Sequence, residues 1–249
     1  MSYQIYEVNA KNREPLIQFM VDALHDSGCT VIYRSPANEA PFRLTFETPY
    51  GERLGIVAYA FLANRKVTKN RPTDEHRFQL KYGSKDGKLH ELWQDPYGLY
   101  TTLLIGINPD QSFFVSADPV LHNPTRFFIS LEFKQQHVDE ILRKRWHVWE
   151  RVRRGSSNEP TEVLVGGTVE SFLHCLRFER EALGEDQGHR QLVAEQLGAQ
   201  TTSSVLLPSG GLEINAPHPR LHALAREFEL TEAEVLDLIE SAPRLKIPL

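Results

Sequence analysis

The sequence predicts an α+β protein: an antiparallel β-meander or pseudo-barrel with flanking helices, followed by a helical C-terminal part. Three observations predict this class. Apolar and polar residues alternate over much of residues 30–133, which is the period of half-buried strands. Turn sequences such as Pro49-Tyr50-Gly51 separate these segments. After residue 134 the apolar spacing becomes helical.

The first half of the chain begins with a helix and continues with strands. Leu16, Phe19 and Leu24 fall on one helical face and Gly28 is a natural C-cap, so we expect a helix over Glu14–Ser27. Strands are then expected at Thr30–Tyr33, Phe42–Glu47, Leu54–Phe61, His76–Tyr82, Thr101–Ile107, Ser112–Ala117 and Arg126–Phe133.

The second half is expected to be mostly helical. A helix over Gln135–Arg154 precedes the linker Gly155–Pro160, which we take as the boundary between a β-rich domain (1–154) and an acidic helical region (155–249). Beyond the linker we expect a strand at Glu162–Val165 and helices at Val169–Leu183, Arg190–Leu197, His218–Phe228 and Thr231–Glu240.

Composition excludes several classes of protein. Hydrophobic residues make up 41% of the 249 residues, which is too apolar for a disordered chain. No apolar stretch approaches the roughly 20 residues that span a bilayer. Residues Met1–Ile5 lack the pattern of a signal peptide, so we expect a cytoplasmic protein with no membrane partner. Cys29 and Cys175 are too few for a disulfide framework or a four-thiolate zinc site, and we expect buried free thiols.

The charge is distributed unevenly along the chain. The formal net charge of −5 argues against a nucleic-acid partner at first sight. Residues 1–154, however, carry 21 basic and 18 acidic side chains, whereas residues 155–249 carry 7 basic and 15 acidic ones. The β-rich part is therefore positive, and we expect it to bind a polyanion.

The densest basic segment is residues 65–88, with eight basic and three acidic side chains. Lys and Arg can hold phosphates, and Arg and Gln can read base edges. Candidate DNA contacts here are Arg65, Lys66, Lys69, Arg71, Arg77, Gln79 and Lys81. The alternative is a solvated strand face beside a charged loop, because any half-exposed strand needs a polar face.

A second basic segment, residues 134–154, carries seven basic and three acidic side chains. Arg143 and Lys144 are its candidate backbone contacts, with Trp146 and Trp149 interleaved nearby. The alternative is an amphipathic helix that packs on the core and turns a basic face outward.

The strands near residues 113–134 also suggest a catalytic site. Asp118 ends one strand, and Glu132 and Lys134 end the next. This order resembles nucleases of the PD-(D/E)XK class, in which two carboxylates hold a magnesium ion at the scissile phosphate and the lysine activates water. The proline that follows Asp118 departs from that pattern, and an acid-x-Lys triplet also occurs at Asp86-Gly87-Lys88.

A different resemblance covers about residues 50–150. It rests on Arg71-Pro72-x-x-Glu75-x-Arg77-x-Gln79, Leu103-Leu104-x-Gly106, Phe114-Val115-x-x-Asp118, His122 and the strand Ser130–Phe133. This order resembles the β-rich, pseudo-barrel DNA-recognition modules of restriction endonucleases and of proteins encoded beside DNA methyltransferases. The resemblance implies that Arg71, Arg77, Gln79 and His122 contact DNA, and that Glu132 and Lys134 are incidental.

The leading hypothesis is therefore a protein of a restriction or defence system that reads specific or modified bases in double-stranded DNA without a cofactor. It is expected to act as a homodimer or with a restriction or methyltransferase partner. The competing hypothesis is an Mg²⁺-dependent endonuclease using Asp118, Glu132 and Lys134. A non-catalytic protein-interaction scaffold remains a third alternative.

Overall fold

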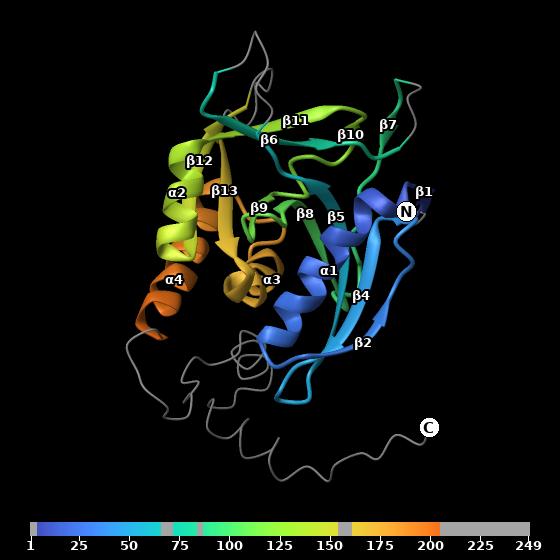
Figure 1. Ribbon diagram of the computed structural model, residues 1–249, viewed down its shortest axis with the longest axis horizontal. Helices are drawn as coiled ribbons and strands as arrows, with labels where there is room; N and C mark the ends of the chain where they lie inside the picture. The colour runs from blue at the N-terminus through green and yellow to red at the C-terminus, as the bar shows by residue number, and fades with distance from the viewer. Residues whose placement is uncertain (1–3, 66–71, 84–86, 154–160, 205–249) are drawn as a thin grey trace, which may run out of the picture. The chain divides into compact units, whose positions relative to one another are not determined.

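The structure, a computed structural model, describes residues 4–65, 72–83, 87–153 and 161–204 (Figure 1). Its centre is a seven-stranded sheet with the strand order β12-β13-β9-β8-β5-β4-β2. These strands are β2 (Thr30–Arg34), β4 (Phe42–Glu47), β5 (Arg53–Leu62), β8 (Tyr100–Asn108), β9 (Phe113–Ala117), β12 (Trp146–Val152) and β13 (Thr161–Thr168). The predicted α+β class is confirmed, and over the described residues the sheet is open rather than closed into a barrel.

All neighbouring strands of this sheet are antiparallel except β5 and β8, which are parallel. A simple meander would join them by a tight turn, but parallel neighbours need a long crossover. The crossover carries two further strands, β6 (Glu75–Leu80) and β7 (Leu89–His90). This departure from the predicted meander places β6 on a face of the sheet instead of in its plane.

The central strands are buried on both faces, which explains their nearly continuous apolar sequence. Ile56, Ala58 and Ala60 of β5 belong to one core. Their neighbours Val57, Tyr59 and Phe61 belong to a second core on the opposite face. The sheet therefore lies between two layers.

Helices form the first layer (Figure 1). They are α1 (Ala10–Asp26), α3 (Phe172–Glu181), which follows the short 3₁₀ turn η1 (Val169–Ser171), and α4 (Gln187–Ser204). Leu16 and Ile17 of α1 share the first core with Phe172 and Phe178 of α3. The helices expected near residues 14–27, 169–183 and 190–197 are therefore confirmed, with shifted ends.

A two-stranded antiparallel ribbon and one helix form the second layer. The ribbon consists of β6 and β11 (Ile129–Lys134), and α2 (Gln135–Lys144) follows at once. A Cβ atom added to Gly106 of β8 would lie only 2.3 Å from the nearest ring atom of Phe78 in β6. Only glycine at position 106 lets the ribbon approach the sheet this closely. Smaller pairings join β7 to β10 (Thr125–Arg126) and β1 (Tyr6–Glu7) to β3 (Glu39–Ala40).

The helix expected over Gln135–Arg154 is wrong in its second half. Helix α2 ends at Lys144, because Arg145 adopts a left-handed conformation with φ 65° and donates its N–H to the Ile141 carbonyl. Residues from Trp146 onward form β12, which pairs along its length with β13. The apolar spacing of this short segment fits a strand as well as a helix, so sheet pairing decided between them.

The described residues belong to one unit, Met1–Leu206. The boundary expected after residue 154 falls inside this unit, where β12 and β13 share one sheet. The predicted helices His218–Phe228 and Thr231–Glu240 lie outside the described residues. Cys29 and Cys175 are buried free thiols, as expected. Among the described helices, none has the length and apolarity needed to cross a membrane.

Candidate nucleic-acid interface

The outer face of the β6–β11 ribbon carries several of the predicted site residues. In β6, Phe78 and Leu80 are fully buried, whereas Arg77 and Gln79 are half-buried and point away from the core. In β11, Leu131 and Phe133 are buried and their neighbours point outward in the same way. The alternation that predicted the strand therefore also predicted its outward face.

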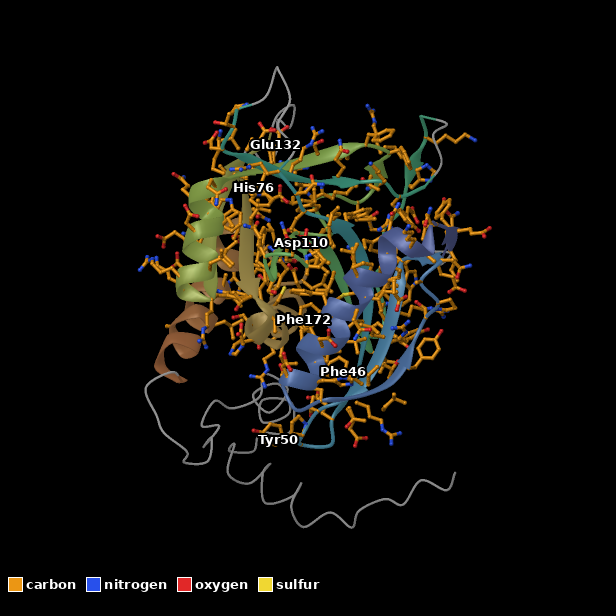
Figure 2. All side chains as sticks on the ribbon, viewed as in Figure 1. Phe46, Tyr50, His76, Asp110, Glu132 and Phe172 are labelled. Carbon is orange, nitrogen blue, oxygen red and sulfur yellow. The ribbon has the colours of Figure 1, made fainter. Side chains whose placement is uncertain are left out.

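The register of the ribbon places these side chains in cross-strand pairs. Arg77 lies opposite Glu132, Gln79 opposite Ser130, and Glu75 opposite Lys134. Directly opposed residues of an antiparallel pair project from the same face. Figure 2 shows Glu132 on the ribbon, on the side away from the central sheet. We call this surface the ribbon face; it consists of Glu75, Arg77, Gln79, Lys81, Phe128, Ser130, Glu132 and Lys134.

Short contacts hold the ribbon face in place. Gln79 Nε2 donates to Ser130 Oγ at 3.2 Å. Lys134 Nζ lies 3.3 Å from an Asp74 carboxylate oxygen. On the other side of β6, the backbone of Arg77 exchanges two hydrogen bonds with Asn64, which places the exposed Arg65 beside the ribbon. Basic and acidic groups thus alternate across the face.

The end of the ribbon adds a cation and an aromatic ring. Lys81 follows β6, and its Nζ lies 5.6 Å from the ring centroid of Phe128, within the range of a cation–π contact. Arg126 of β10 is exposed on the neighbouring strand pair. The structure therefore brings together Arg65, Arg77, Gln79 and Lys81 of the first basic segment. Lys66, Lys69 and Arg71 lie outside the described residues.

The other predicted basic contacts lie elsewhere. Arg143 and Lys144 are in the last turn of α2, where both bind Glu140, at 2.6 Å and 2.7 Å. Hydrogen bonds from Lys144 and Arg143 lower the pKa of Glu140 to about 2. His122 is buried rather than exposed, so it takes no part in the ribbon face.

His122 belongs to a buried ionic group. Its Nε2 lies 2.7 Å from Glu162 Oε1, and Arg151 donates to the other oxygen of Glu162 at 2.9 Å. Burial raises the pKa of Glu162, but the hydrogen bonds and charges of His122 and Arg151 outweigh it, and the net pKa is lowered. Arg151 also donates to the Ser130 carbonyl of β11 at 3.4 Å, which connects this group to the ribbon.

Asp118 belongs to a second buried group, centred on Arg190. Arg190 donates to Glu179 Oε2 at 2.9 Å, and its Nε lies 3.4 Å from Asp118 Oδ2. Asp118 also accepts hydrogen bonds from Gln187 Nε2 and from the Val120 N–H. Ser116 Oγ donates to Glu179 at 2.6 Å. Burial raises the pKa of Glu179, and Arg190 offsets this only in part. The sequence offered no local signal for this group, because its members come from β9, α3 and α4.

The three candidate catalytic residues therefore lie in different environments. Asp118 lies at the end of β9 among the helices' polar groups, whereas Glu132 and Lys134 lie on the ribbon face. No cluster of three or more His, Cys, Asp or Glu side chains able to hold a metal ion occurs within the described ranges. These contacts do not bring together Asp118 and Glu132, the two carboxylates expected to hold magnesium.

A third cluster, absent from the predicted sites, joins α2 to β12. The rings of His137 and His147 are nearly parallel to that of Trp149, and His137 Nδ1 lies 3.1 Å from His147 Nε2. Burial and the neighbouring His147 lower the pKa of His137 to about 4. The signal in the sequence was the i, i+2 spacing of His147 and Trp149, which is meaningful only once the segment is known to be a strand.

Comparison with known proteins gives one match. No curated protein and no solved structure matches the chain. The family model described as methylase-associated X1 matches residues 54–176. The matched range begins in β5 and ends in α3, and it contains the whole of the β6–β11 ribbon. This part of the chain is therefore similar to methylase-associated X1 proteins, which suggests a role related to restriction–modification.

Proposed function

We propose that this chain is the DNA-binding component of a restriction–modification or related defence system, and that it binds double-stranded DNA through the ribbon face. The observation that carries the proposal is that Arg77 and Gln79 both lie on the outward face of β6, inside the methylase-associated match. The same match supports a methyltransferase as the functional partner.

A two-stranded ribbon has dimensions that fit the major groove. Arginine there binds guanine through two hydrogen bonds, and glutamine binds adenine in the same way. Glu132, opposite Arg77, is suited to accept a hydrogen bond from cytosine N4. Lys81 and Arg65 lie at the margins, where contacts to phosphates would set the register.

The balance of charge on the ribbon face supports base reading more than general DNA affinity. Phosphate binding is driven by an excess of Lys and Arg. On this face Glu75 and Glu132 each oppose a basic residue across the ribbon. Such a face binds unselected DNA weakly and gains affinity only where base edges match its donors and acceptors.

The test is binding to duplex DNA by fluorescence anisotropy, with methylated and unmethylated sequences and a series of salt concentrations. The Arg77→Ala/Gln79→Ala variant should bind at least about tenfold more weakly to the preferred duplex, since each bidentate base contact contributes about 1–3 kcal/mol. Arg34→Ala is the matched control, because Arg34 is an exposed, ion-paired arginine on the edge strand β2.

Equal affinity of the double variant and the wild type would overturn the proposed face. The same reactions, run with and without magnesium and analysed on gels, report any cleavage of the DNA. If the preferred sequence is palindromic, two chains per duplex are expected, related by a two-fold axis.

A further inference from the structure

We infer that a small pocket beside Arg13, at the start of α1, binds a phosphate group. Arg77 and Gln79, which the proposed function assigns to base reading, are not among the residues that line it. The pocket can therefore be tested with inorganic phosphate in the absence of DNA. Three properties carry the inference: the place and size of the pocket, the uncompensated charge of Arg13, and the chemistry of the described walls.

The pocket lies where strand β4 ends. The pairing of β4 with β5 starts at Phe42 opposite Ala58, so residues Tyr59–Leu62 of β5 extend past β4. The lining residues come from α1, from this part of β5 and from the end of β6. The pocket holds about 210 Å³ of unfilled space, part of it open to solvent. Pockets for drug-sized molecules hold about 300–1,000 Å³, so this one suits a small ion or one end group of a larger ligand.

Arg13 reaches this pocket from the first turn of α1. One Nη of Arg13 donates to the Ala60 carbonyl of β5, and the guanidinium lies 5.1 Å from the ring centroid of Phe61. A guanidinium has five N–H donors in a planar fork. Within the described part of the chain, the Ala60 carbonyl is the one hydrogen-bond acceptor of Arg13. None of its side-chain nitrogens is both buried and unpartnered, so the remaining donors are open to a ligand.

The charge of Arg13 is not neutralised by a carboxylate. Burial lowers the pKa of Arg13, because its charged form has lost part of its hydration. The neighbouring acid, Glu14, is already paired with Arg34 at 2.7 Å. Among the described residues, no ion pair includes Arg13 and no acidic side chain lines the pocket. A partly desolvated cation without a counter-charge favours an anionic ligand.

The two tyrosines in the walls are neutral and already hydrogen-bonded. The Tyr59 hydroxyl accepts a hydrogen bond from the Trp93 N–H at 2.7 Å, and burial raises the pKa of Tyr59 to about 12. The Tyr82 hydroxyl donates to the Gln4 carbonyl at 2.9 Å. Their rings therefore give the pocket walls of low polarity, beside which the attraction between a guanidinium and an anion is stronger than in water.

The basic residues of the pocket match a phosphate group. The planar fork of Arg13 can bind two phosphate oxygens at once. Lys81 also lines the pocket and supplies a second positive charge, which the single charge of a carboxylate would not match. Because Lys81 belongs to the ribbon face as well, a DNA strand on that face is one source of the phosphate. A free phosphate compound is the other.

Thermal melting in inorganic phosphate, chloride and acetate, at equal ionic strength and neutral pH, tests the pocket. Phosphate at ten times its dissociation constant should raise the melting temperature of the wild type by about 3–6 °C. Phosphate also stabilises proteins in general, because it is excluded from their surface. The measured quantity is therefore the difference between the wild type and Arg13→Met, which removes the guanidinium and keeps an apolar chain against Phe61. Arg34→Met is the matched control, because Glu14 already pairs with Arg34.

Arg13→Met should lose the rise that depends on the pocket, Arg13→Lys should keep part of it, and Arg34→Met should keep all of it. An equal rise in the wild type and in Arg13→Met, or an equal rise in acetate, overturns the inference. Lys81→Met changes an exposed residue and should weaken phosphate binding by about two- to fivefold. If Arg13→Met does not fold, Lys81→Met decides, and an unchanged dissociation constant for phosphate overturns the inference.

Anisotropy titrations with duplex DNA over a salt series distinguish the two sources of phosphate. If the source is DNA, Arg13→Met should weaken binding equally for all sequences and reduce the salt dependence by about one counterion. If the source is a free compound, Arg13→Met should bind DNA like the wild type and still lose its response to phosphate. A wild-type protein that binds no duplex contradicts the proposed function, and the melting measurements then decide on the pocket by themselves.

Discussion

Glu132 lies directly opposite Arg77 in the antiparallel pairing of β11 with β6. The carboxylate of the nuclease hypothesis and the guanidinium of the DNA-binding hypothesis are therefore neighbours on one exposed face. Their opposite charges reduce the attraction of the ribbon face for phosphate and leave hydrogen-bonding groups of both kinds for base edges. Because of this pairing, the DNA-binding and nuclease hypotheses make different predictions for the Glu132→Gln variant.

Glu132→Gln should raise the affinity for unselected duplex DNA by about two- to fivefold at low salt, because it removes an outward-facing, half-buried negative charge opposite Arg77. Anisotropy titrations at two salt concentrations measure this, with Glu47→Gln on β4 as the control. The nuclease hypothesis expects unchanged binding and loss of magnesium-dependent cleavage; that result would reject our assignment of Glu132 to recognition.

Asp118→Asn should lower the free energy of unfolding by about 3–5 kcal/mol, since it removes one partner of a buried ionic group and leaves Arg190 undercompensated. Urea denaturation measures the change. Asp110→Asn is the control, because Asp110 is exposed in the turn between β8 and β9. A variant of wild-type stability that had lost DNA cleavage would return Asp118 to a catalytic role.

Gly106→Ala should destabilise the protein by about 1–3 kcal/mol, because the new methyl group meets the Phe78 ring that packs the ribbon on β8. Adding Phe78→Leu should recover part of the loss, and a double-mutant cycle measures that coupling. Equal effects with and without the second substitution would show that the contact between these two residues is not the cause.

The free energy of unfolding should fall as the pH drops from about 6.5 toward 4. Burial and His147 lower the pKa of His137 to about 4 in the folded protein, so the unfolded chain binds protons first on acidification and is favoured. Urea denaturation between pH 6.5 and 5 measures the slope. His137→Phe keeps a flat ring against Trp149 and should flatten the slope, whereas His189→Gln, at an exposed position, should leave it unchanged.

Local sequence patterns predicted most elements of the sheet and the outward face of its ribbon. The alternation in His76–Tyr82 placed Phe78 inside and Arg77 and Gln79 outside, because successive side chains of a strand point to opposite faces. The same reasoning failed after Arg145. A short apolar run fits two periods, and only the pairing of β12 with β13 selects the strand.

Charge was predicted less well than periodicity. The sequence showed an excess of basic residues in 65–88, but it contained no information on which acids would face them. Register placed Glu132 opposite Arg77, and burial placed His122 against Glu162. In each pair the two residues are far apart in the sequence. Strand pairing and packing bring them together in space.

The sequence by itself thus determined the α+β class, most of the strands, and a polar β6 face with arginine and glutamine, since these depend on the spacing of neighbouring residues. The tertiary structure decided that this strand would pack on one face of the sheet and pair with β11, and that Asp118 would be buried beside Arg190. Those outcomes depend on contacts between segments far apart in the chain, which no local pattern encodes.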